Sequence, residues 1–292
     1  MKKAIYFILI STISISVFTQ NIDTGNKLHA DVNMVLNVKQ FSQFVKRFNY
    51  EEDFTGKKIE KEFSSGFSRA EYIKLLFNSS DDRIGSEGNP TKYDSLIYTF
   101  ISKTINDSLI IDRLSENIYA FTACKVKYLG QIRTLYLILK TEKIKKGYRW
   151  ALYDAHADFF PVEDEVIKII KEAKYPDILK FIPPTSNEVN FSHLRKVFED
   201  KDNLTLYVMK EGAGNGLNIM IHMVQTGELE FMYVEKLSYF IFDIPGWVIE
   251  VKEFIRDTEN SGWLINNIAE WNKDSKLYMQ NLLSVLRDEH KY

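Results

Sequence analysis

The stretch from Asn117 to Asp158 constrains the fold more than any other part of the chain. It contains three long segments in which apolar and polar residues alternate, and short polar or glycine-bearing turns separate them. Alternation with a period of two places every second side chain on the same face of a β-strand. A second stretch, Glu228 to Ile268, repeats this pattern. We therefore expect an antiparallel sheet of three strands in each half of the chain.

Segments with helical periodicity lie before and after these strands, so the sequence predicts an α+β fold. Apolar residues recur at helical spacing from Asp31 to Phe48, with Asp31 as the N-cap. A capping box at Ser68–Glu71 begins a second helix, and Thr91 begins a third. Further helices are expected at 162–174, 191–198 and 271–290.

Short apolar runs elsewhere are harder to assign, because a buried strand and a buried helical turn have similar composition. We expect strands at 109–114 and 217–225, whereas 204–209 fits either element. His222 would then be a packed histidine of a sheet. The glycine cluster at 211–216 is expected to form a hairpin turn, because it lacks the lysine and the strand–helix context of a phosphate-binding loop.

The chain divides into four regions. Residues 1–20 have the form of a secretory signal peptide, because Lys2 and Lys3 precede an apolar run; an uncleaved N-terminal anchor is the alternative. Residues 31–160 are expected to form a first α+β domain, and 161–184 a helix and a proline-rich linker. Residues 185–292 would form a second α+β domain with a C-terminal helix. No later apolar run approaches the length of a membrane span.

Charge and cysteine content exclude several classes of protein. The formal net charge is −2, which argues against a nucleic-acid partner, since phosphates require a basic excess. The single cysteine, Cys124, allows no intramolecular disulfide. It lies in an alternating segment, so a buried and unreactive thiol is expected. No motif indicates a cofactor.

The last strands of the two stretches resemble each other. Gly147–Asp154 and Ser261–Asn267 each have a glycine turn, then a tryptophan, then alternating apolar and polar residues. Trp150 matches Trp263 in this comparison. Either the chain contains a duplication, or two unrelated sheets end in similar strands.

Helices followed by long antiparallel strands that end in a W-x-[LI]-x-[DN] segment resemble the nuclear transport factor 2-like superfamily of cystatin-like cones. The resemblance covers 31–160 best and 185–270 less well. It implies two tandem cone-like domains, each with a curved sheet wrapped around helices and a pocket inside. The superfamily includes isomerases, dehydratases and many proteins with a pocket but no catalysis, so the resemblance does not fix a function.

The polar end of the first stretch is the clearest candidate for chemistry. On a regular strand Asp154, His156 and Asp158 would share a face with Trp150 and Leu152. If that face is concave, Asp154 and His156 would transfer protons at the end of a pocket. The same array has the donor types of a divalent-metal site. The simplest interpretation is a solvated strand end, and no metal is expected.

Aromatic residues crowd the hairpin around Ile244–Gly246. They include Tyr239, Phe242 and Trp247. Neighbouring strand positions face opposite sides, so these rings require either cover on both faces or an exposed patch. An exposed patch would bind a partner; packing between two domains is the alternative.

Taken together, these features favour an exported bacterial protein of the periplasm or cell surface that binds without catalysis. Its partner would be an unknown small molecule or an envelope protein. One alternative is a small-molecule enzyme of the isomerase, dehydratase or hydrolase type that uses Asp154 and His156. Another is a structural subunit of an envelope assembly.

Overall fold

The computed structural model describes residues 37–60, 67–86, 88–145, 147–161, 179–209, 215–257 and 260–271. The expected signal peptide, the helix at 162–174 and the helix at 271–290 beyond its first residue lie outside these ranges. The elements follow one another as β1 (Asn37–Val38), α1 (Phe41–Phe48), α2 (Arg69–Leu75), α3 (Lys92–Asn106), β2 (Ile118–Tyr128), β3 (Gln131–Ile144), β4 (Gly147–His156), the 3-10 helix η1 (Pro184–Val189), α5 (Leu194–Glu199), the 3-10 helix η2 (Lys201–Tyr207), α6 (Asn215–Thr226), β5 (Leu229–Ile241), β6 (Trp247–Phe254) and β7 (Ser261–Glu270).

The predicted helix starts at α2 and α3 are confirmed. Ser68 and Glu71 form a complete capping box at α2, and Thr91 and Asp94 form one at α3. These reciprocal bonds satisfy backbone N–H groups that have no partner within the helix. The first helix was placed too early, because residues 37–38 form a strand and α1 begins at Phe41.

The seven described strands form one sheet, in the order β1-β7-β6-β5-β2-β3-β4. The two predicted three-stranded stretches are present as the antiparallel meanders β2–β3–β4 and β5–β6–β7. They meet at the centre of the sheet, where β2 pairs with β5 in an antiparallel ladder. β1 adds to the far edge by parallel pairing with β7. The α+β class is therefore as expected.

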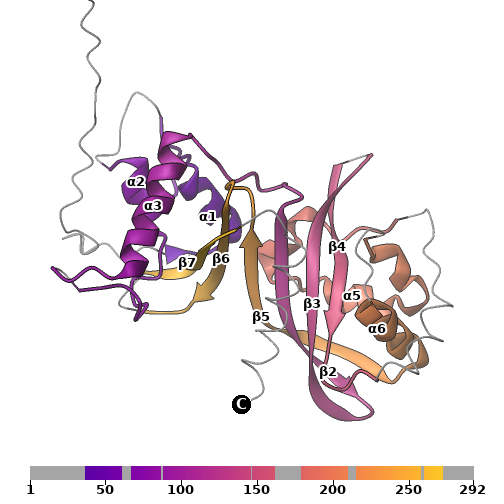
Figure 1. Ribbon diagram of the computed structural model, residues 1–292. Helices are drawn as coiled ribbons and strands as arrows, with labels where there is room; N and C mark the ends of the chain where they lie inside the picture. Colours follow the sequence, from indigo (N-terminus) through magenta and orange to yellow (C-terminus); the bar gives the residue numbers. More distant parts are fainter. Residues whose placement is uncertain are drawn as a thin grey trace, which may run out of the picture.

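Helices of each half lie beside strands of the other half. The N-terminal helices α1–α3 lie beside β6 and β7, and α6 lies beside β4 of the first meander (Figure 1). α6 also contacts β5, and α5 packs on β5. Phe100 of α3, for example, contacts Trp247 of β6 at a centroid distance of 5.3 Å. The two tandem domains expected from the sequence are not confirmed, because each half contributes helices to the other half's strands within one continuous sheet.

Two short assignments from the sequence were wrong. Residues 217–225 belong to helix α6, and 109–114 contain no strand. The run at 217–225 is apolar on most of its circumference, so α6 is buried widely and lacks the polar stripe that marks a surface helix. His222 is exposed on α6 and is not part of a sheet. The ambiguous segment 204–209 lies largely in η2.

Candidate functional site

The candidate acid–base residues do not lie where a regular strand would place them. Leu152 pairs with Leu139 and Asp154 pairs with Ile138, so Tyr153 is an extra residue in β4. Such a bulge shifts the alternation of the strand by one position. Trp150, Leu152, Ala155 and Ala157 all belong to the main core. Asp154 and His156 therefore lie on the face opposite Trp150, and the expected shared face is wrong.

The three polar residues have separate surroundings. The Asp154 carboxylate accepts a hydrogen bond of 2.8 Å from the backbone N–H of Ala155. The His156 ring makes an edge contact with Phe160, with centroids 6.3 Å apart. The Asp158 side chain is 75% exposed, and its carboxylate is 4.0 Å from Arg133. Within the described ranges, no group of three or more acidic, histidine or cysteine side chains is arranged to hold a metal ion.

The predicted aromatic surface is buried. Tyr239 and Trp247 belong to the main core on the helix-covered face of the sheet. Phe242 belongs to a second buried cluster on the other face, with Tyr119 and Phe240. The hypothesis that Tyr239, Phe242 and Trp247 form one exposed patch is therefore wrong. The adjacent residues Tyr239 and Phe240 of β5 face opposite sides of the sheet, and each is buried in the cluster on its own side.

Among the described strands, β5 has no partner on one edge over more than half of its length. Toward β2, the ladder extends from Leu229 to Ile241. Toward β6, only Ser238 to Ile241 are paired. No described strand pairs with residues 229–237 on that side. An unpaired edge presents backbone donors and acceptors to any segment that can lie beside it.

Two bulges explain why β5 separates from β6. Met232 and Glu235 are extra residues that have no partner in the β2 ladder. Each bulge bends and twists its strand locally, so two bulges within four residues turn β5 away from its neighbour. The sequence carries a trace of this irregularity, because Phe231 to Val234 are four consecutive apolar residues where alternation requires a polar one.

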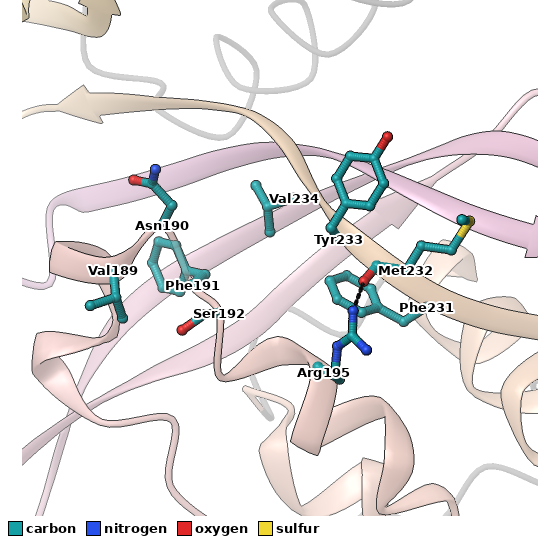
Figure 2. A pocket seen from close by; sticks show the side chains of 9 residues that line it. All are labelled: Val189, Asn190, Phe191, Ser192, Arg195, Phe231, Met232, Tyr233 and Val234. Atoms are coloured by element: carbon teal, nitrogen blue, oxygen red, sulfur yellow. Dashed lines mark hydrogen bonds between the residues drawn. The ribbon is translucent and has the colours of Figure 1, made fainter.

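A cleft of about 230 Å³ lies beside this free edge (Figure 2). It is lined by four β5 residues and by the segment that joins η1 to α5, namely Phe231, Met232, Tyr233, Val234, Val189, Asn190, Phe191, Ser192 and Arg195. The Arg195 guanidinium donates a hydrogen bond of 2.8 Å to the Met232 carbonyl oxygen. The cleft therefore has one wall of strand backbone and one wall of loop and helix.

The loop wall has an unusual backbone. Asn190 and Phe191 have φ values of 48° and 52°, and left-handed geometry is rare for a large side chain such as phenylalanine. Phe191 is held in place because its ring packs edge-on against Trp150, with centroids 5.2 Å apart. The conformation buries Phe191 and leaves Asn190 exposed at the cleft.

The rim of the cleft is open to solvent and combines apolar residues with the polar residues Asn190, Ser192 and Arg195. The Val189 side chain is 50% exposed and Tyr233 is 51% exposed, on opposite walls. Arg195 is the only charged residue among those that line the cleft. Val189 and Tyr233 are placed to contact a segment that lies between the two walls.

The segment behind the loop wall contains a serine–histidine contact that the sequence did not indicate. Ser186 Oγ lies 3.4 Å from His193 Nδ1. Ser186 is completely buried, so its hydroxyl has no access to a substrate. The contact therefore closes the turn between η1 and α5 and is not a nucleophile–base pair.

Comparisons with protein-family models, with curated proteins and with solved structures find no match to this chain. The candidate site is thus defined by its own geometry.

Proposed function

We propose that this chain is an exported binding protein whose partner, an envelope protein, docks in the cleft beside β5. The observation that carries the proposal is the combination of a free backbone edge at 229–237 with a cleft whose rim exposes Val189 and Tyr233. Export rests on the leader-like sequence of residues 1–20 and is part of the proposal.

The geometry supports binding better than proton transfer. Asp154 and His156 lie on β4, and neither residue lines the cleft. The cleft itself offers one cation, a backbone edge and apolar groups, which recognise a polypeptide through hydrogen bonds and buried area. No described helix is long and apolar enough to cross a membrane.

Site-specific photo-crosslinking in the native host tests the proposal. A photoreactive phenylalanine analogue is introduced at position 189 or 233, and at Tyr98 and Ile255 as matched exposed positions outside the cleft. We expect one discrete adduct from both cleft positions and none from the control positions. Equal labelling at all four positions, or labelling at the control positions alone, would overturn the proposal.

A further inference from the structure

The two meanders are structurally equivalent in several details. In each, the last strand has a tryptophan followed three residues later by a bulge, at Tyr153 in β4 and at Asn266 in β7. The residue before each bulge, Leu152 or Ile265, makes a parallel bridge to a segment of the helical layer. β2 therefore corresponds to β5, and β3 corresponds to β6.

This equivalence shows how the second meander differs from the first. β2 pairs with β3 over ten residue pairs, from Tyr119 to Tyr128. β5 pairs with β6 over only four, from Ser238 to Ile241.

Traced through the ladders from the two bulges, Ala120 of β2 is equivalent to Tyr239 of β5. Residues 229–237 are therefore an extension of β5 that has almost no counterpart in β2, which begins at Ile118. No described strand pairs with this extension on the side of β6.

We infer that the cleft receives an extended segment of a partner protein, which adds to β5 as a strand and continues the antiparallel β5–β6 ladder beyond Ser238. This inference rests on the proposed binding function and specifies the form of the partner. Strand addition uses the backbone groups of an exposed edge for affinity and neighbouring pockets for selectivity.

The cleft also specifies the chemistry of the added strand. Its apolar residues would receive an apolar side chain of the partner, with Val189 and Tyr233 on either side. Arg195 is the only charge in the lining, and its hydrogen bond to Met232 fixes the guanidinium beside the strand edge. A carboxylate on the partner strand is the complementary group, because a guanidinium binds it through parallel hydrogen bonds.

Selection from a phage-displayed library of short random peptides provides a defined probe. The full-length protein is the bait, and Val189→Asp/Tyr233→Asp is the counter-selection bait; both positions are half exposed, so the double variant should fold. Tyr98→Asp/Ile255→Asp is the matched control. The selected peptide is then synthesised unmodified, with alternate backbone amides N-methylated, and with its acidic residue changed to the amide.

Strand addition predicts that N-methylation on one alternate set of amides weakens binding by about tenfold or more, because each methyl group removes a backbone donor. Methylation of the other set should have a much smaller effect. Arg195→Gln should weaken the acidic peptide and leave its amide form unchanged. If cleft-dependent peptides tolerate both methylation patterns, strand addition is wrong and the binding function stands. If no peptide depends on Val189 and Tyr233, both proposals are wrong.

Discussion

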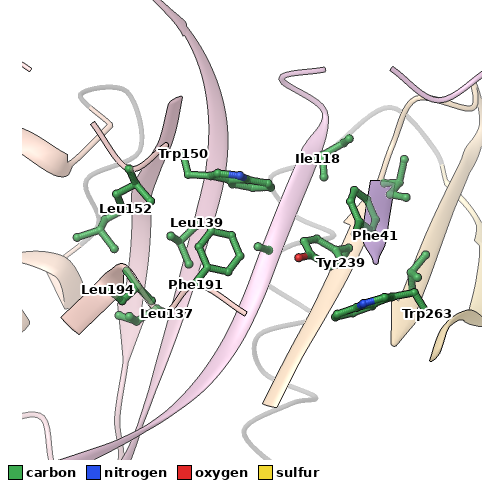
Figure 3. Close-up of a cluster of buried hydrophobic side chains, with 14 of the residues drawn as sticks. Phe41, Ile118, Leu137, Leu139, Trp150, Leu152, Phe191, Leu194, Tyr239 and Trp263 are labelled. Atoms are coloured by element: carbon green, nitrogen blue, oxygen red, sulfur yellow. The ribbon is translucent and has the colours of Figure 1, made fainter. Parts of the chain in front are cut away.

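Trp150 and Trp263 approach the same tyrosine ring, Tyr239, from the two sides of the sheet's centre (Figure 3). Their ring centroids lie 6.4 Å and 5.0 Å from that of Tyr239. Phe41 of α1 stacks on the same ring at 3.9 Å. Tyr239 therefore joins the residues under both helical layers into a single core, although the last strands of the two meanders lie far apart in the sheet.

Tyr239→Ala is expected to destabilise the fold by about 3–5 kcal/mol, because it leaves a cavity where both halves meet. Tyr239→Phe should cost only about 1 kcal/mol, since it removes a long hydrogen bond of 3.4 Å to the Asn187 carbonyl oxygen and keeps the ring. Chemical denaturation measures both values. Tyr98→Ala, at a 48% exposed site, should change stability by less than about 0.5 kcal/mol. If Tyr239→Ala and Tyr98→Ala lowered the unfolding free energy by equal amounts, Tyr239 would not hold the core together.

Arg149 is a completely buried cation that ties β4 to the segment containing η2. Its guanidinium pairs with Glu142 at 2.7 Å and donates to the carbonyl oxygens of Lys180, Leu206 and Val208. Arg149→Ala removes the cation from the carboxylate and a donor from each carbonyl oxygen, although that of Leu206 keeps its hydrogen bond from the Lys180 N–H. We expect a loss of about 3–5 kcal/mol in unfolding free energy.

Arg133→Ala is the matched control for Arg149→Ala. The Arg133 side chain is partly exposed and lies 4.0 Å from Asp158, so its removal should cost no more than about 1 kcal/mol. Urea denaturation of the two variants measures the difference. A loss at Arg149 as small as that at Arg133 would mean that the buried network does not hold η2 on the sheet.

At Gly216, helix propensity favours alanine, whereas packing against β4 favours glycine. Alanine in a helix is favoured over glycine by about 1 kcal/mol. A Cβ atom at position 216 would nevertheless lie 1.8 Å from the Ala155 carbonyl oxygen, where β4 meets the start of α6. We expect Gly216→Ala to destabilise the protein by about 1–3 kcal/mol, because backbone must move. His222→Ala, on an exposed position of the same helix, should be neutral or slightly stabilising in the same melting experiment.

The sequence predicted the strands and the capped helix starts, because these depend on local patterns. It did not predict the bulge that interrupts β4. Alternation predicts both meanders, and the reciprocal side-chain bonds of a capping box need only two residues, such as Ser68 and Glu71. The bulge at Tyr153 reverses which of the later β4 residues face the core, yet it shifts the alternation of apolar and polar residues by only one position. Its trace is the pair of small core residues Ala155 and Ala157, out of phase with Trp150.

The arrangement of elements depends on contacts between distant residues, which periodicity does not record. The β2–β5 ladder joins strands from the two halves of the chain, and nothing in either strand alone specifies that neighbour. The candidate cleft follows from this topology, because β5 has a free edge only where the short strand β6 leaves it. Sequence patterns could therefore predict the strands, but not the cleft between β5 and the η1–α5 loop.

The single thiol should be inert in the native protein. Cys124 is completely buried on β2, and burial raises its pKa to about 12, although a contact with the Thr122 hydroxyl acts in the opposite direction. The reactive thiolate is then scarce and shielded at pH 8. We expect no modification by a disulfide reagent at pH 8 until a denaturant is added, followed by modification of one thiol per chain. Rapid modification without denaturant would show that β2 opens locally.

Glu188 is expected to make stability depend on pH. Its carboxylate lies among Ser42, Arg113 and Lys46, and burial raises its pKa above the usual value even though these three groups act to lower it. A raised pKa in the folded state means that the folded protein binds the proton more tightly than the unfolded chain does. Stability from this group is therefore fully present below the unfolded pKa and is lost as pH rises through the folded pKa.

Glu188→Gln keeps the shape of the side chain and removes its charge. The variant should therefore melt at a higher temperature than wild type at pH 7. The difference should shrink toward zero at about pH 3, which is below the pKa of about 4.3 of a glutamate in the unfolded chain. Glu230→Gln, at an exposed position of β5, should show no such dependence. Thermal melting across this pH range provides the comparison. An advantage for the glutamine variant that is the same at both pH values would assign the effect to packing and not to ionisation.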